Sequence, residues 1–219
     1  MRLPFTQDEF FAIFAQYNRV FAVAAVMWWL AAVALLVLAR RNPPRHVGTL
    51  SLFLGALWLW NAVAYHALFF TRINPAAWPF AAMFAVQAVL FFRAAAGRRL
   101  DYLSSAGWSH TAGLALIAYA LLYPFLTIAL GHPYPATPTF GVPCPTALLT
   151  IGLLLTVRTS IPVALAIVPV LWGFIGGSAA VLLAVATDYV LPGAGLLLTW
   201  RLWRQRALRP SGFSGASRA

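Results

Sequence analysis

Long apolar stretches alternate with short polar or basic turns along the whole chain. About 20 largely apolar residues are needed to cross a ~30 Å hydrocarbon core, so the pattern predicts an all-α, polytopic transmembrane helix bundle of about seven spans. The fifth span is short for a full crossing unless it begins inside the preceding loop. The predicted spans cover residues 17–39, 48–70, 76–92, 111–130, 146–157, 161–183 and 189–203.

The residues before the first span, 1–16, predict an interfacial amphipathic segment. Thr6 and Glu9 fit a capping box, in which the Thr6 hydroxyl accepts from the Glu9 backbone and the Glu9 carboxylate reaches back. Phenylalanines then lie beside acidic and amide side chains, a pattern typical of a helix at the bilayer surface. An early start of the first span is the alternative. Because acids stand where a signal peptide carries positive charge, we expect the first span to be retained.

A proline-rich segment separates the fourth and fifth spans. Residues 131–146 contain five prolines, the only cysteine and one of the four histidines. Proline donates no backbone hydrogen bond and disfavours helix at the residue before it. We therefore expect a fixed, irregular loop at one membrane face or dipping into it. In the sixth span, residues 161–183, Gly173 and Gly177 make a small-xxx-small spacing that favours close helix packing.

The basic residues set the predicted orientation. All 15 are arginines, and most fall on alternate connections between spans. Cytoplasmic connections are enriched in arginine, so we expect the amino terminus and the proline loop outside and the carboxyl terminus inside. The bundle would then cover residues 17–203, followed by a basic, disordered tail over 204–219.

Composition narrows the functional classes. The chain is 62% hydrophobic and 9% charged, which is the composition of a membrane protein. The net charge of +11 is explained by topology, because the arginines are scattered between apolar runs, and we expect no nucleic-acid partner. The absence of lysine excludes a retinal Schiff base. Only four acidic residues are available and no hydrolase motif is present, so we expect no enzyme.

The predicted topology gathers scarce polar residues near the outer face. Polar groups near hydrocarbon are costly, so they usually face a bundle interior or a wet cavity and become candidates for a binding site. Solvation in interfacial water is the alternative. The candidates for binding a ligand or solute are His66, Arg72, Asn74, His132, Tyr134 and Asp188.

A metal site is a second hypothesis at the same face. Imidazole and thiolate suit copper or zinc, so His66, His132 and Cys144 are candidate ligands if the fold brings them together. Haem between two histidines is the neighbouring alternative. The spacing matches no compact ligand motif, so no cofactor is predicted.

Two runs together, residues 65–76 and 131–146, with the amino-terminal segment 4–18, resemble a family of bacterial multi-pass membrane proteins catalogued only as a domain of unknown function. The resemblance covers nearly the whole chain. It implies the bacterial inner membrane and no particular activity.

The sequence therefore predicts a small-solute or ion transporter or channel-like protein with a polar site facing the periplasm. The alternative is a non-catalytic accessory subunit that binds a metal, haem or protein partner through the same surface. The bilayer is the expected environment, and self-association or a membrane-protein partner is left open.

Overall fold

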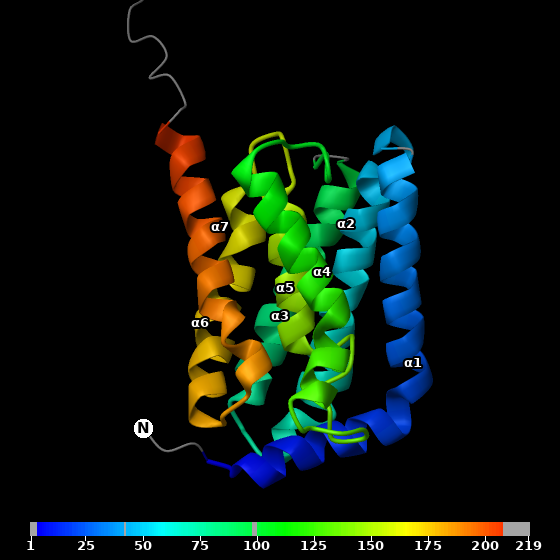
Figure 1. Cartoon of the computed structure of the whole chain (residues 1–219), viewed down its shortest axis with the longest axis vertical. Coiled ribbons are helices and arrows are strands. Elements are labelled where there is room, and N and C mark those ends of the chain that lie inside the picture. Colours follow the sequence, from blue (N-terminus) through cyan, green and yellow to red (C-terminus); the bar gives the residue numbers. More distant parts are fainter. Residues whose placement is uncertain (1–3, 42, 98–99, 208–219) are drawn as a thin grey trace, which may run out of the picture.

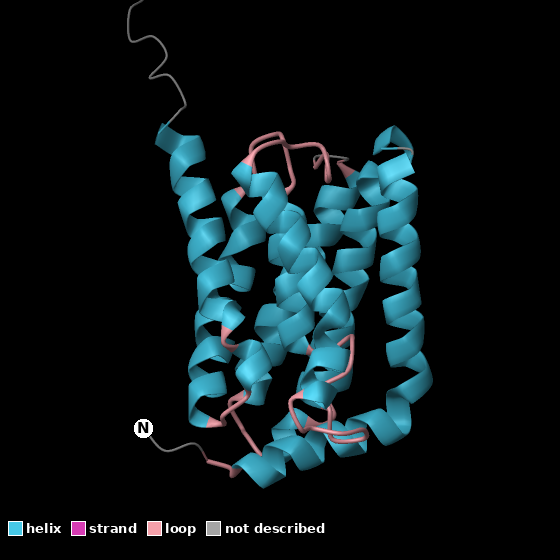
Figure 2. Ribbon diagram, viewed as in Figure 1, coloured by secondary structure: helices cyan, strands magenta, loops and turns pink. Residues whose placement is uncertain are grey.

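A computed structural model describes residues 4–41, 43–97 and 100–207. Within these ranges all regular secondary structure is helical (Figure 2). The prediction of an all-helical fold is confirmed for these residues, which form seven α-helices. The helices are α1 (Gln7–Arg41), α2 (Pro43–Trp60), α3 (Ala77–Ala96), α4 (Trp108–Ala129), α5 (Pro143–Leu155), α6 (Val163–Leu182) and α7 (Val190–Ala207), with the π-helix η1 (Asn61–Ala67) and the 3₁₀ turns η2 (Phe70–Arg72) and η3 (Ala186–Asp188).

In the part of the chain that the structure describes, five helical segments are long and apolar enough to cross a membrane: Gln7–Arg41, Gly48–Arg72, Ala77–Ala96, Trp108–Ala129 and Val163–Leu182. The other two helices differ for separate reasons. α5 has 13 residues, about 20 Å at 1.5 Å per residue, and α7 carries three arginines in its second half. A crossing by all seven helices therefore stays a prediction.

α1 begins with the predicted capping box and bends once. Thr6 N and Thr6 Oγ1 donate to Glu9 Oε2 at 2.7 and 3.0 Å, and Glu9 N donates to Thr6 Oγ1 at 3.2 Å, which confirms the motif. The helix leaves regular geometry at Phe21. Before this bend it lies across one end of the bundle, and after it the helix runs along the side (Figure 1). The sequence analysis predicted that the first span begins at residue 17, which lies in the part of α1 before this bend.

The short helix α5 forms the centre of the bundle. All its residues are buried except Cys144, which is half-buried, and it packs against α4, α6 and α7. Close approach to α4 depends on glycine, because a Cβ on Gly113 would lie 2.6 Å from the Gly152 carbonyl oxygen.

The predicted close packing at Gly173 and Gly177 is also confirmed. A Cβ on Gly177 would lie 2.3 Å from Pro192 Cγ, and one on Gly173 would lie 3.0 Å from the Leu191 carbonyl oxygen. These two glycines therefore let α6 and α7 approach closely. α7 continues to Ala207, and the rest of the predicted tail, 208–219, lies outside the described residues.

Candidate functional site

One end of the bundle is closed by four chain segments that are far apart in sequence. The first part of α1, the turn before α3, the proline loop and the connection between α6 and α7 meet there, at the end opposite the carboxyl terminus of α7 (Figure 1). A cavity of about 210 Å³ lies among them. It exceeds the ~150 Å³ of an engineered protein cavity that binds benzene, so it has room for one aromatic ring and a short chain.

The walls of this cavity are mainly aromatic and aliphatic. Phe5, Phe10 and Phe14 come from the amino-terminal segment, and their rings contact one another and Phe70 at 4.9 to 6.3 Å between centroids. α6 and the residues after it supply small and aliphatic groups on the other side. These residues are Ile175, Gly176, Ser178, Ala179, Ala180, Leu182, Leu183 and Val185.

A buried carboxyl group also lines this apolar cavity. Asp188 is only 4% exposed, and its Oδ1 accepts a hydrogen bond of 2.6 Å from Tyr123 Oη. The Cys144 thiol is a second, weaker donor beside the carboxylate and lowers its pKa. Burial raises the pKa of Asp188 to about 6, although these hydrogen bonds partly offset the effect. A carboxylate has about four acceptor positions, so two donors leave capacity for a ligand.

One face of α4 fixes the position of Asp188. Tyr119, Tyr123 and Thr127 recur every four residues and therefore project from the same side of the helix. Tyr119 Oη donates to the Thr187 carbonyl oxygen at 2.9 Å, and Thr127 Oγ1 lies 3.3 Å from Thr187 Oγ1. The turn η3 is thus held against α4 immediately before Asp188.

Trp172 places an unsatisfied donor at the cavity. Its side chain is 6% exposed and lines the cavity from α6. Its indole N–H lies near the Cys144 sulfur, a weak acceptor, and makes no regular hydrogen bond. A buried N–H without an acceptor costs about 1–3 kcal/mol. A ligand with an acceptor atom would remove that cost.

His66 lies behind the aromatic wall. It is fully buried on the π-helix η1, and neither ring nitrogen has a hydrogen-bond partner. Its ring is 4.6 Å from Phe84, 5.3 Å from Trp172 and 5.8 Å from Phe80, measured between centroids. Trp172 and Phe80 line the cavity and His66 does not. Single π-helical turns are common at functional sites.

The proline loop is held in place by Asn18. Its Nδ2 donates to the carbonyl oxygens of Pro135 and Thr137, both at 2.7 Å, and its Oδ1 accepts from Thr139 Oγ1 at 2.7 Å. Further along the loop, the Gly141 carbonyl accepts from Tyr17 Oη at 3.4 Å. The loop therefore has a fixed shape and forms a wall of the cavity through Pro138 and Val142.

Of the six predicted solute-binding residues, only Asn74 and Asp188 line the cavity. Arg72 is exposed, donates to Gln16 Oε1 at 3.2 Å and lies 4.5 Å from the Phe69 ring centroid. His132 and Tyr134 hold the proline loop against α1. His132 stacks on Phe11 at 4.0 Å, and Tyr134 Oη donates to the Asn18 carbonyl oxygen at 3.3 Å.

The structure separates the predicted metal ligands. Cys144 lines the cavity, His66 lies behind its wall and His132 stacks on α1. Within the described ranges, no three histidine, cysteine or acidic side chains are grouped closely enough to hold a metal ion. Tyr65, Tyr123 and Trp172 are among the cavity residues that were not predicted from the sequence. For Tyr123 the sequence did contain a signal, because Tyr119, Tyr123 and Thr127 are spaced along one helix face.

Comparison with known proteins gives one match. A family model described as a family of unknown function (DUF6064) matches residues 7–210. No curated protein and no solved structure matches the chain.

Proposed function

The chain belongs to this family, which assigns it no activity. From the geometry of the cavity, we propose that the protein is a membrane carrier for a small solute. The observation that supports this proposal is the buried Asp188 carboxyl in a cavity with largely apolar walls. The proposed role is not enzymatic. The proposed ligand has an apolar body and one amino group, since an ammonium group would pair with the carboxylate while the aromatic rings accept the rest.

The pKa of Asp188 supports exchange of a proton for the solute. Because burial raises this pKa to about 6, the carboxyl can gain or lose a proton near physiological pH. A cationic solute stabilises the ionised form, so its binding releases the proton. Protonation then favours solute release.

The arginine distribution supports an outward-facing cavity. Arg40, Arg93 and Arg201 lie in the carboxyl-terminal parts of α1, α3 and α7, and Arg158 follows α5. The carboxyl ends of α1 and α7 lie at the end of the bundle opposite the cavity (Figure 1). By the positive-inside rule this end is cytoplasmic, so the cavity faces the periplasm in the bacterial inner membrane. We further propose that all seven helices cross the bilayer.

Packing around α5 favours a carrier over an open channel. Leu148, Leu149 and Ile151 are at most 1% exposed. They lie on α5 between Cys144, which lines the cavity, and Arg158, which lines the pocket at the arginine-rich end. Transport therefore requires a change in the packing of these helices.

The experiment is a binding and flux assay with a panel of small arylalkylamines. Wild-type protein in proteoliposomes is expected to take up one of these amines at pH 7.5, and Asp188→Asn is expected to abolish both binding and uptake. Asp101→Asn is the matched control, because Asp101 lies at the other end of the bundle. Equal uptake by wild type and Asp188→Asn, or no binding of any amine to a folded wild type, would refute the proposal.

A further inference from the structure

The end of the bundle opposite the cavity contains a basic pocket. Its volume is about 300 Å³, and three arginines contribute to it: Arg158 from the loop after α5, and Arg201 and Arg204 from α7. Ser105, Ser109, Ala106 and Trp108 complete the lining at the start of α4. The three guanidinium groups provide the charged donors that a phosphate group requires. The Ser105 and Ser109 hydroxyls donate instead to the Leu155 carbonyl oxygen, at 3.4 and 2.6 Å.

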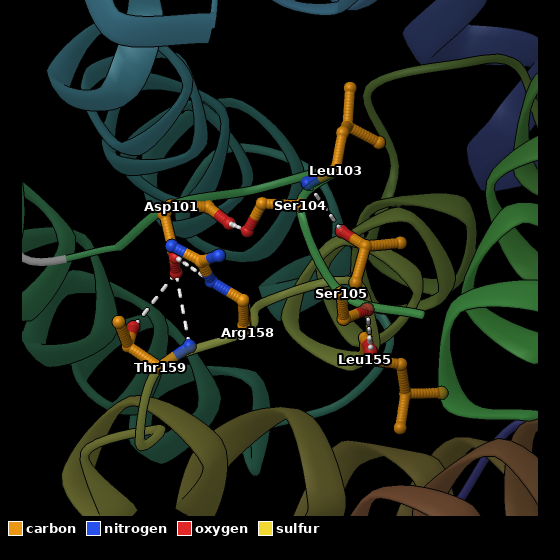
Figure 3. A network of polar contacts seen from close by, with 8 residues as sticks. Asp101, Leu103, Ser104, Ser105, Leu155, Arg158 and Thr159 are labelled. Carbon is orange, nitrogen blue, oxygen red and sulfur yellow. Dashed lines mark hydrogen bonds and ion pairs between the residues drawn. The ribbon is translucent and has the colours of Figure 1, made fainter. Parts of the chain in front are cut away.

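The charge balance of this pocket is positive. Asp101 forms an ion pair with Arg158, with 3.7 Å between Oδ2 and Nε (Figure 3). Burial alone would raise the pKa of Asp101, but hydrogen bonds from the Thr159 hydroxyl and backbone N–H outweigh it and keep the pKa below its ordinary value. Asp101 is thus ionised and orients Arg158. Within the described residues, Arg201 and Arg204 make no ion pair and are available to an anion.

An apolar groove continues from this pocket along α7. Its volume is about 520 Å³, and it shares with the basic pocket a border formed by two tryptophans. Trp200 lines the groove, Trp108 lines the pocket, and their rings lie 4.3 Å apart. The Arg204 guanidinium lies 5.0 Å from the Trp200 ring centroid. The other lining residues are Leu116, Val190, Gly193, Ala194, Leu196 and Leu197.

The length of the groove matches one leaflet of a bilayer. Residues 190–200 extend for about 15 Å at 1.5 Å per helical residue. Half of a ~30 Å hydrocarbon core has the same thickness. Tryptophans are enriched at the membrane interface, so the border between groove and pocket lies where a phospholipid changes from acyl chain to headgroup.

We propose that the basic pocket and the groove together bind one anionic phospholipid, with its phosphate on Arg158, Arg201 and Arg204 and an acyl chain along α7. Charge complementarity selects an anionic headgroup, and the apolar groove distinguishes a lipid from a free phosphate ion. Basic pockets between membrane helices bind anionic headgroups for the same reason. This site is at the opposite end from Asp188 and does not depend on the proposed carrier function.

The test measures binding of phosphatidylglycerol to the full chain in detergent micelles, with phosphatidylcholine and inorganic phosphate as the other probes. Each arginine near an anionic lipid surface contributes a factor of about five, so Arg201→Gln/Arg204→Gln is expected to weaken phosphatidylglycerol binding about thirtyfold. Arg40→Gln/Arg93→Gln, with two exposed arginines elsewhere, is the matched control and is expected to bind normally. Arg201→Lys/Arg204→Lys, which keeps the charge and loses the bidentate geometry, is expected to lie between them.

A second variant tests the groove without changing charge. Gly193 lines the groove and a Cβ on it would meet no atom within 4 Å, so Gly193→Leu adds an apolar side chain to the groove. It is expected to weaken phosphatidylglycerol binding, whereas Ala118→Leu on an exposed face of α4 is expected to have no effect.

Three results would overturn the proposal. The first is equal binding of phosphatidylcholine and phosphatidylglycerol. The second is equal weakening of phosphatidylglycerol binding by Arg201→Gln/Arg204→Gln and by the control Arg40→Gln/Arg93→Gln. The third is binding of inorganic phosphate together with unchanged phosphatidylglycerol binding by Gly193→Leu. This result would identify a site for soluble anions.

Discussion

Replacement of Asp188 by asparagine should change how stability depends on pH. The folded-state pKa of Asp188 is about 6, compared with an ordinary value of 3.8, because the group is buried. The folded protein therefore holds this proton more tightly than the unfolded chain. This contribution to stability is complete below pH ~4 and is lost as the pH rises through 6.

The size of the effect follows from the pKa difference. About two pKa units, at 1.36 kcal/mol each, correspond to a loss of about 3 kcal/mol in the free energy of unfolding between pH 4 and pH 7. For a chain of this length such a loss lowers the melting temperature by roughly 6 to 12 °C. The other carboxyl groups contribute their own slopes, so the informative quantity is the difference between wild type and Asp188→Asn.

Thermal unfolding in detergent micelles from pH 4 to 7.5, followed by tryptophan fluorescence, measures that difference. Wild type should lose stability relative to Asp188→Asn as the pH rises from 4 to 6, and the difference should stay constant above pH 7. Asp101→Asn is the control and should not remove this slope, because the pKa of Asp101 is lowered rather than raised. Parallel pH profiles for wild type and Asp188→Asn would refute the assignment of a raised pKa to Asp188.

Three further predictions concern packing and hydrogen bonds. Gly177→Ala should destabilise the protein by about 1–3 kcal/mol, because the added Cβ would overlap Pro192. Gly193→Ala is the control and should have little effect. Equal melting temperatures for the two variants would contradict the packing of α6 on α7. Asn18→Ala should lower the free energy of unfolding by about 2–4 kcal/mol and increase protease cleavage in the proline loop, because two loop carbonyls lose their donor. An unchanged cleavage rate would show that other contacts hold the loop. Thr6→Ala should cost about 1 kcal/mol by removing the cap of α1, and a larger loss in the unfolding assay would mean that Thr6 has a further role.

The helical elements could be predicted because each depends on local sequence. Apolar length indicated the helices, the Thr6 and Glu9 pair indicated the start of α1, and Gly173 and Gly177 indicated a close helix contact. The prolines of residues 131–146 predicted an irregular loop, which the structure confirms up to Val142, whereas Pro143 and Pro145 lie in the first turn of α5. Each of these signals acts within a few residues of its own position.

The composition of the cavity could not be predicted in the same way. Asp188 acquires its environment from Tyr123, 65 residues earlier, and from Cys144 on α5. His66 was expected at the site, but the π-helical turn directs it towards Phe84, behind the wall formed by Trp172. Such relations depend on how the helices pack, and a single sequence contains no direct signal of them.

Proton release on ligand binding tests the central claim most directly. At pH 5.5 a carboxyl group with a pKa of about 6 is roughly three-quarters protonated, so binding of an arylalkylamine to wild type should release about 0.75 proton per bound molecule. Titration calorimetry in two buffers of different ionisation enthalpy gives this number. Saturable amine binding without proton release, or the same release from Asp188→Asn, would contradict a site built around Asp188.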